Sequence, residues 1–405
     1  MEQEKLQEYA SLLIRKGINV QPGEELWINA QLHQIDFVRM CVEEAYKAGA
    51  KKVRVRWSDE KITKLGYMYQ TTSELCKVPE YSISEYRYMK KKLPSMLHII
   101  SDDPAAFKGI KQSKITRSNL KFRKKVKPYR DAMDGKYKWC IGAVPSKEWA
   151  EKVFPHDPNA EEKLWEAILS TSRVDGKALE NWDKHNAELM KHRKQLAELK
   201  LQYLHYKSSN GTDLKVELIK DIEWGGGVEF TNSGNSYNPN IPSEEVFTSP
   251  KAGSVEGIVY SSKPLSYSGQ LIEDFSVRFE KGKVVEVKAK KNQKLLKQMI
   301  SMDEGSKMLG EVALVPYDSP IRNSGVLFYE TLFDENAACH LALGAGFKEC
   351  LPNGANLTNE KAHALGINDS VIHVDFMIGT KDLEIVGIDY KGKKTTIFKN
   401  GNWAI

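Results

Sequence analysis

The spacing of apolar residues changes about halfway along the chain of 405 residues, and this change constrains the fold more than any other feature. Up to about residue 145, short strand-like runs alternate with segments of helical periodicity. Such alternation predicts a doubly wound, mostly parallel sheet, which is an α/β fold. The expected strands cover residues 26–30, 53–57, 96–100 and 139–144, and residues 35–48 form an expected helix.

From about residue 204 onward, apolar and polar residues alternate with a period of two, which is typical of antiparallel strands. Turns at Lys281-Gly282 and Lys391-Gly392 each join two such runs and predict hairpins. The second half is therefore expected to be an α+β domain rich in antiparallel sheet. A chain of this length is too long for one core, so we predict two domains, 1–205 and 206–405, the first ending in a long helix.

Composition excludes several classes of protein. Hydrophobic residues make up 41% and charged residues 28%, which is typical of globular proteins, and no apolar window is long enough to span a membrane. The charged N-terminal segment has no features of a targeting peptide, so we expect a cytoplasmic location and no membrane partner. Five scattered cysteines without a C-x-x-C pair are expected to be reduced: Cys41, Cys76, Cys140, Cys339 and Cys350.

The densest basic run is KFRKKVKPYR, residues 121–130, in a chain with a net charge of +6. Nucleic-acid binding requires basic residues organised on one face together with aromatic stacking partners. This run is isolated, so we interpret it as a solvated loop or helix face and predict no nucleic-acid partner.

The segment VIHVDFMIG, residues 371–379, indicates a buried strand that carries two polar side chains. His373 and Asp375 are two residues apart, so both project from the same face of the strand. A buried imidazole beside a buried carboxylate needs a partner, because an unpaired buried charge is costly. Taken alone, the segment fits a metal site and a His–Asp hydrogen bond within a core equally well.

Three further segments offer imidazole or carboxylate groups. Residues 331–344, TLFDENAACHLALG, are expected to form a helix with Asp334 as its N-cap and His340 inside it, where a lone histidine is usually a core residue. Glu311 opens an apolar strand and, taken alone, resembles a solvent-facing strand end. In a Pro- and Ser-rich loop, Glu244 and Glu245 on their own suggest a solvated acidic pair.

Together these segments provide two imidazoles and three carboxylates, a mixed set of nitrogen and oxygen donors that suits zinc, cobalt or manganese. Five groups exceed the three protein ligands of one catalytic tetrahedral ion, whereas two ions that share carboxylates would use all five. Paired ions occur in aminopeptidases because they generate a hydroxide nucleophile and polarise the scissile carbonyl. The sequence has no H-E-x-x-H, which excludes the helix-borne zinc peptidase site.

The sequence resembles the aminopeptidase T/AmpS/PepS family of metallopeptidases. The resemblance covers the whole chain and is clearest over residues 238–379, in the ordered motifs NIPSEEVFTSP, GEVALVPYDSPI, LFDENAACHLALG and HVDFMIG. It implies a dinuclear site containing zinc, cobalt or magnesium, removal of N-terminal residues from peptides with a free N-terminus, and a homodimer. By the register of the family, the implied metal ligands are Glu245, Glu311, His340, His373 and Asp375.

One position departs from the family pattern. Members often have a tyrosine near the metals, seven residues after the motif histidine, and this chain has Phe347 there, followed by Lys348. Phenylalanine cannot donate a hydrogen bond to an oxyanion. We expect Tyr317 to supply that donor and Glu311 to relay a proton.

Two other functions are consistent with parts of the sequence. His340, His373 and Asp375 could form the facial triad of a mononuclear iron(II) oxygenase, although no histidine follows Asp375 as that motif usually requires. The basic run at residues 121–130 could instead serve a non-catalytic binding module. The number of bound metal ions, two, one or none, distinguishes the three functions.

Overall fold

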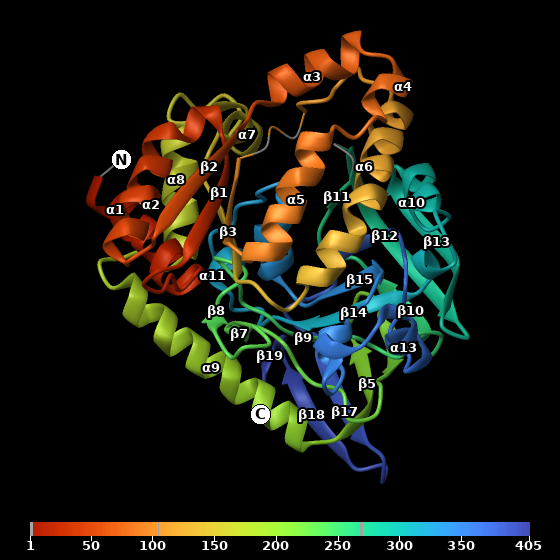
Figure 1. The fold of residues 1–405 in the computed structure, drawn as a ribbon. Coiled ribbons are helices and arrows are strands. Elements are labelled where there is room, and N and C mark those ends of the chain that lie inside the picture. Colours follow the sequence, from red (N-terminus) through yellow and green to blue (C-terminus); the bar gives the residue numbers. More distant parts are fainter. Residues whose placement is uncertain (1–2, 102, 104, 268–269) are drawn as a thin grey trace. The chain divides into compact units, whose positions relative to one another are not determined.

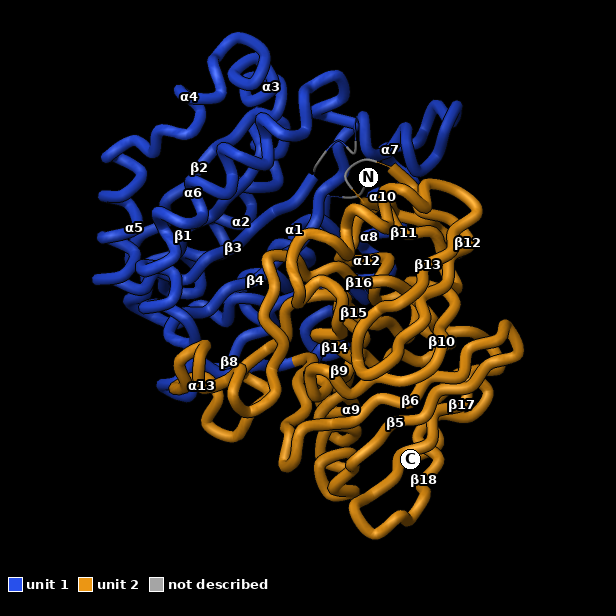
Figure 2. Tube along the Cα trace, turned by 90° about the vertical axis from the view of Figure 1, so that its right-hand side faces the viewer, with its two compact units in different colours: residues 1–182, 228–241 blue, residues 183–227, 242–405 orange. Residues whose placement is uncertain are grey.

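The computed structural model describes residues 3–101, 103, 105–267 and 270–405. The chain forms two compact units, Met1–Trp182 with Val228–Ile241, and Asp183–Gly227 with Pro242–Ile405 (Figure 2). Residue 205, where the sequence predicts a boundary, lies in a strand of the second unit. Among the described residues, no helix has the length and apolar character needed to cross a membrane.

The first unit contains a four-stranded sheet in the order β2-β1-β3-β4, and every neighbouring pair is parallel. This confirms the predicted doubly wound α/β fold. In Figure 1, helices α1 and α2 lie on one side of the sheet and α5 and α6 on the other. The strands are β1 (Glu25–Gln31), β2 (Lys52–Ser58), β3 (Ser95–Ile100) and β4 (Trp139–Ala143), and the helices are α1 (Gln3–Leu12), α2 (Ile35–Lys47), α5 (Glu80–Lys92) and α6 (Gln112–Met133).

The basic run at residues 121–130 lies in α6, and all its lysines and arginines are exposed, as predicted for a solvated helix face. The predicted long helix is α9, which begins in the first unit and continues in the second. The remaining helices of this region are α3 (Glu60–Tyr69), α4 (Thr72–Leu75), α7 (Lys147–Val153), α8 (Ala160–Thr171) and α9 (Ala178–Glu198).

The second unit contains a large antiparallel sheet in the order β11-β12-β10-β6-β5-β17-β18-β19, with β13 also paired to β12. Both predicted hairpins are present, as β12–β13 and β17–β18. The strands are β5 (Leu201–Lys207), β6 (Asp213–Glu217), β10 (Glu256–Tyr260), β11 (Leu265–Tyr267), β12 (Gln270–Glu280), β13 (Lys283–Lys291), β17 (Glu384–Asp389), β18 (Lys394–Lys399) and β19 (Asn402–Trp403).

A smaller antiparallel sheet in the second unit, in the order β16-β15-β14-β9, contains the segments with candidate metal ligands (Figure 2). Its strands are β9 (Val246–Thr248), β14 (Leu309–Leu314), β15 (His340–Gly344) and β16 (His373–Met377). On β15, Leu341 and Leu343 belong to the main hydrophobic core of the unit. Because side chains alternate along a strand, His340, Ala342 and Gly344 face the other side.

The prediction of a helix containing His340 was wrong. The helix α12 covers only Thr331–Asp334 and is capped by Glu330, so Asp334 ends this helix instead of beginning one. A single 3₁₀ turn, Glu335–Ala337, follows, and His340 is the first residue of β15. A short apolar run cannot be distinguished from helix by its period alone, and here the hydrogen bonds of β14 and β16 determine the strand.

Candidate metal centre

The register of the smaller sheet brings a carboxylate of β14 next to one of β16. Ala342 of β15 pairs with Glu311 on one side and with Asp375 on the other. Residues that pair directly across an antiparallel ladder point to the same face. Glu311 and Asp375 therefore flank the small Ala342 side chain on the face opposite the core.

A β-bulge in β14 is what lets Glu311 reach this face. The register shifts between Leu309 and Glu311, so Leu309 pairs with Leu343 and faces the core while Glu311 pairs with Ala342. Without the extra residue, Leu309 and Glu311 would point to the same face of the sheet, because side chains two positions apart on a regular strand share one face. That residue is Gly310, where an added Cβ would lie 2.1 Å from the Ala345 carbonyl oxygen.

Both candidate histidines project from the same face as the two carboxylates. His373 pairs with Gly344, and His340 pairs with Ala313 and Met377. The Nε2 atom of His373 lies 3.1 Å from Oε2 of Glu311 and 3.2 Å from Oδ1 of Asp375. Gly344 has a φ of 112°, and an added Cβ there would lie 2.1 Å from the Ile372 carbonyl oxygen.

Of the acidic pair that precedes β9, Glu245 is the residue that reaches this cluster. Its Oε2 lies 3.1 Å from Nε2 of His340, whereas Glu244 lies toward His185, at 3.8 Å. Both glutamates are buried, so the interpretation of a solvated acidic pair was wrong. Gly226 packs on the Glu245 backbone, where an added Cβ would lie 2.2 Å from the carbonyl oxygen.

Each imidazole is oriented by the main chain in the way that metal ligands usually are. Nδ1 of His373 lies 2.7 Å from the Ala345 carbonyl oxygen, and Nδ1 of His340 lies 3.2 Å from that of Ala338. If each Nδ1 carries the hydrogen and donates it, the lone pair of Nε2 is directed at the carboxylates and is available to a metal ion. This is the expected tautomer for histidines that bind a metal through Nε2.

The groups form two sets that share one residue. Glu245, Glu311 and His340 offer ligand atoms within 4.8 Å of one another, and so do Glu311, His373 and Asp375. Two ligand atoms that each lie about 2.0–2.3 Å from the same ion are separated by roughly 4.8 Å or less. Glu311 is therefore common to two sets of groups, each of which could hold a metal ion.

Sequence reasoning missed a sixth group, Glu335. It lies in the 3₁₀ turn five residues before His340, and its side chain is half-buried. Burial, followed by the negative charges of Asp375 and Glu245, raises the pKa of Glu335 well above its ordinary value. The D-E-N sequence before His340 shows that acidic groups lie close to this histidine in the chain. In the predicted helix, however, Glu335 would have pointed away from the strand.

The electrostatics show that the cluster requires positive charge. Burial raises the pKa of Glu311 to about 7. Burial alone would lower the pKa of each histidine, but hydrogen bonds and nearby carboxylates raise it to about 10 for His340 and to about 12 for His373. The protonated imidazoles thus balance carboxylates that would otherwise repel one another in a buried site.

These residues fit a metal ion on two further observations. Oδ1 of Asp375 is buried, and apart from the ion-pair contact with His373 at 3.2 Å it has no well-formed hydrogen bond within the described residues, although burial of such an atom is costly. The adjacent His373 holds the pKa of Asp375 below its ordinary value against the effect of burial, so that carboxylate is ionised. An ionised, buried carboxylate oxygen directed at other ligand groups is what a cation site provides.

The two candidate donors for an oxyanion differ in their surroundings. The Phe347 ring lies 4.9 Å from the His373 ring and also packs against Phe247. The Tyr317 hydroxyl accepts a hydrogen bond from Arg322, whose guanidinium lies over the tyrosine ring. The described contacts of Tyr317 are with Arg322 and Gly401 and include none of the six residues of the cluster.

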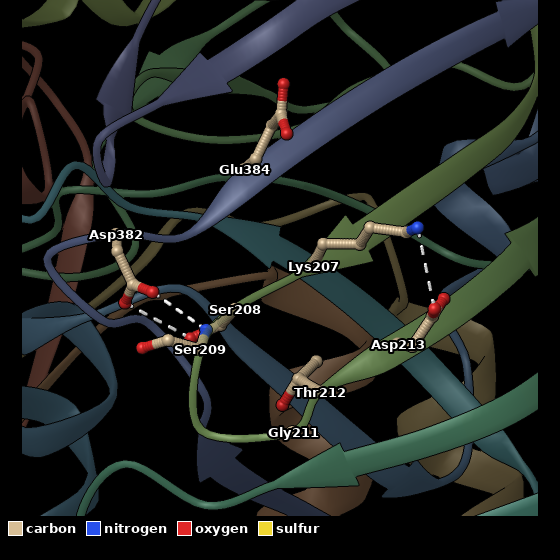
Figure 3. A pocket seen from close by; sticks show the side chains of 8 residues that line it. All are labelled: Lys207, Ser208, Ser209, Gly211, Thr212, Asp213, Asp382 and Glu384. Carbon is tan, nitrogen blue, oxygen red and sulfur yellow. Dashed lines mark hydrogen bonds and ion pairs between the residues drawn. The ribbon is translucent and has the colours of Figure 1, made fainter.

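A separate polar hollow of about 430 Å³ lies beside the β5–β6 turn (Figure 3). Its Asp382 accepts hydrogen bonds from the Ser209 amide at 2.7 Å and the Thr380 hydroxyl at 2.8 Å. Its Asp213 lies 2.6 Å from His205 and 3.6 Å from Lys207. These carboxylates secure the ends of neighbouring strands, so the hollow is explained as a structural feature.

Comparison with known proteins identifies the class to which this fold and site belong. The sequence profile of the thermophilic metalloprotease (M29) family matches residues 2–403, so the chain belongs to that family. Aminopeptidase AmpS of Bacillus subtilis (strain 168) is 40% identical over 99% of this chain and 98% of its own length. Aminopeptidase T of Thermus thermophilus is 36% identical over 99% of this chain and 98% of its own length. This chain is accordingly a metallo-aminopeptidase.

The solved structures agree with this assignment. Wild-type AmpT from Thermus thermophilus superposes with a TM-score of 0.91 at 35% identity and covers 99% of both chains. A 2,5-dihydroxypyridine dioxygenase from Pseudomonas putida KT2440 reaches a TM-score of 0.51 at 11% identity over 99% of this chain and 96% of that one. The second likeness is one of fold alone and does not favour an oxygenase.

Proposed function

We propose that this chain is a dinuclear enzyme that releases N-terminal amino acids from peptides. The observation that carries the proposal is that Glu311 is common to two sets of metal-ligand groups. One ion would be held by Glu245, Glu311 and His340, and the other by Glu311, His373 and Asp375. Glu335 lies within electrostatic range of both sets.

Charge balance supports two ions in preference to one. The cluster contains four carboxylates, Glu245, Glu311, Glu335 and Asp375, whose full ionisation would place four negative charges in a buried site. Two divalent cations neutralise that charge, whereas one leaves half of it uncompensated. Two imidazoles among the donors favour zinc or cobalt over magnesium, which prefers oxygen ligands and retained water.

When bound, such ions supply Lewis acidity, which lowers the pKa of a water molecule and polarises the scissile carbonyl. The residues of the chain have complementary roles. The main-chain contacts of His340 and His373 fix the direction of each Nε2, and the bulge at Gly310 presents Glu311 between the two sets. Glu311, which lies between the two sets, is the proposed relay of the proton from the attacking water to the leaving amine.

Tyr317 is the proposed donor to the oxyanion in place of the tyrosine that the family resemblance implies at position 347. Because Arg322 donates to the phenolic oxygen, the hydrogen of that phenol is left for another acceptor. The guanidinium over the ring also strengthens the phenol as a donor. Phe347, which packs on His373, would keep that ligand in position and exclude water from it.

Elemental analysis of the fully active protein tests the metal count. We expect two divalent ions per chain, and loss of turnover in His373→Ala and Asp375→Ala with an intact fold by circular dichroism. A fully active protein with at most one ion per chain would contradict the dinuclear site. A near wild-type rate for His373→Ala under full metal supplementation would contradict the assignment of His373.

The substrate is tested with a panel of aminoacyl arylamides after reconstitution with zinc, cobalt or magnesium. The names of the relatives support removal of N-terminal residues, so a free α-amino group should be required. N-acetylated peptides should therefore resist cleavage. Efficient cleavage of such blocked peptides would indicate an endopeptidase instead.

We also propose that the chain forms a homodimer in the cytoplasm. All five cysteines are free, which suits a reducing compartment. The helix α3 has no buried residue and exposes an apolar stripe, formed by Ile62, Leu65, Met68 and Tyr69. A second copy of the chain covering this stripe would remove it from water.

A further inference from the structure

A cavity of about 460 Å³ opens beside the C-terminal end of α9, and none of its lining residues belongs to the metal cluster. Its floor is apolar and deeply buried, formed by Leu196, Leu201, Leu218 and Trp224. A volume of this size falls within the usual range of pockets for small molecules. A ligand in the cavity would pack its apolar part against this floor, whose side chains are only 1–6% exposed.

The rim of the cavity carries charges of both signs. Lys200, Lys220 and Asp221 line it, and Nζ of Lys200 lies 3.8 Å from Oδ1 of Asp221, a long separation for an ion pair. Lys200 and Asp221 both have left-handed backbones, with φ of 47° and 58°. Such conformations disfavour side chains other than glycine, asparagine or aspartate, so Lys200 in particular is held at a cost to stability.

The wall that carries Trp224 is fixed before any ligand arrives. Nε of Arg193 on α9 donates to the Trp224 carbonyl at 2.7 Å, and its Nη1 donates to the Gly226 carbonyl at 3.0 Å. The next residue, Gly225, exchanges two backbone hydrogen bonds with Phe247 of β9. A preformed wall lowers the entropy cost of binding.

We propose that this cavity is a binding site for a free amino acid with a large apolar side chain. The side chain would cover the Leu and Trp floor, the carboxylate would pair with Lys220 and Lys200, and the ammonium would pair with Asp221. Adjacent charges of opposite sign match a zwitterion whose two charged groups are joined through one carbon atom. A simple apolar carboxylate would bring a like charge close to Asp221 and would offer it no ammonium group in return.

Equilibrium dialysis of the metal-loaded enzyme with radiolabelled L-leucine tests the site. Binding should persist in His373→Ala, which lacks a proposed metal ligand, and should weaken at least tenfold in Asp221→Asn and in Lys220→Gln. Ala197→Trp, on the exposed wall of the cavity, should abolish it by filling the space. N-acetylleucine and leucinamide, which each lack one charge, should bind at least tenfold more weakly than leucine.

The control is Lys394→Gln, which removes a charge from β18 outside the cavity and should leave leucine binding unchanged. The cavity variants should hydrolyse arylamides at the wild-type rate, which would show that the metal site is intact. Leucine binding that disappears in His373→Ala and is unaffected in Asp221→Asn would assign all binding to the metal site and overturn the proposal. Equal binding of leucine and N-acetylleucine would overturn the zwitterion as its ligand.

Discussion

The Phe347 ring packs 4.9 Å from the ring of His373, at the position where relatives often have a tyrosine. A phenol at this position would lie beside a proposed metal ligand, and if it donated to the oxyanion, phenylalanine there would remove one donor from the transition state. Loss of one such donor typically costs about 10²–10³ in turnover unless another group takes over. The preserved set of ligands favours a replacement, and Tyr317 is the candidate.

The kinetics of two single substitutions test this replacement. We expect Tyr317→Phe to lower kcat by about tenfold or more with little change in KM, because the hydrogen bond would form only in the transition state. Phe347→Tyr should leave the rate similar or raise it modestly. If Tyr317→Phe leaves both kcat and KM unchanged, Tyr317 is only a packing residue beneath Arg322.

Metal affinity should depend steeply on pH. In the metal-free protein the pKa is about 10 for His340 and about 12 for His373, so both imidazoles are protonated at pH 7 and must lose a proton when a metal binds. Affinity therefore rises with pH, by about tenfold per pH unit for each proton released. Zinc titrations between pH 6 and 8, in buffers of different ionisation enthalpy, measure both the slope and the proton count. An affinity independent of pH would contradict this charge balance.

The sequence identified five residues of the cluster and missed the sixth for a physical reason. Glu311, His340, His373 and Asp375 lie in apolar segments, where polar groups stand out. Glu245 lies in a Pro- and Ser-rich loop and was chosen over Glu244 by the family resemblance alone. Glu335 lies in a 3₁₀ turn that directs it toward the sheet, and local periodicity assigned that turn to a helix. The bulge that turns Glu311 toward the site depends on the pairing of β14 with β15. The paired residues Glu311–Ala342 and Leu309–Leu343 are 31 and 34 positions apart, so no local pattern reveals the bulge.

At the scale of elements, the face of β15 should tolerate only small residues at its centre. Ala342 is fully buried between Glu311 and Asp375. Ala342→Leu should separate these carboxylates and reduce metal content to one ion or none, with a loss of about 1–3 kcal/mol in stability from overpacking. Elemental analysis and denaturant unfolding measure the two effects.

The matched control lies next to it in sequence and on the opposite face. Leu341→Ala removes a core side chain and should destabilise the protein by about 2–5 kcal/mol. It should nevertheless retain two ions, because it does not face the cluster. Equal metal loss in the two variants would show that metal binding depends on overall stability and not on space at Ala342.

At the scale of the whole molecule, the sequence predicted both kinds of sheet but not the path of the chain between the units. Residues 228–241 return to the first unit, where the Ile141 amide donates to the Pro239 carbonyl at 2.8 Å and the Ile241 amide donates to the Ile141 carbonyl at 3.0 Å. These bonds join residues about 100 positions apart, and the segment also contains the short paired strands β7 (Glu229–Phe230) and β8 (Ser236–Tyr237). Local periodicity indicates which elements form, whereas such long-range pairing decides to which unit a segment belongs.

The apolar stripe on α3 gives the proposed homodimer a testable surface. Its four side chains, Ile62, Leu65, Met68 and Tyr69, are 50–81% exposed and recur at helical spacing. If a second copy covers the stripe, a charge placed there must lose its water on association, and this desolvation is strongly unfavourable. Leu65→Glu should therefore give monomers at micromolar concentration in sedimentation velocity, where the wild-type protein should be a dimer. Tyr81→Glu, at an equally exposed aromatic residue on α5, should leave the dimer intact. A Leu65→Glu dimer as tight as wild type would exclude the stripe as the interface, and a monomeric wild-type protein would exclude the homodimer itself.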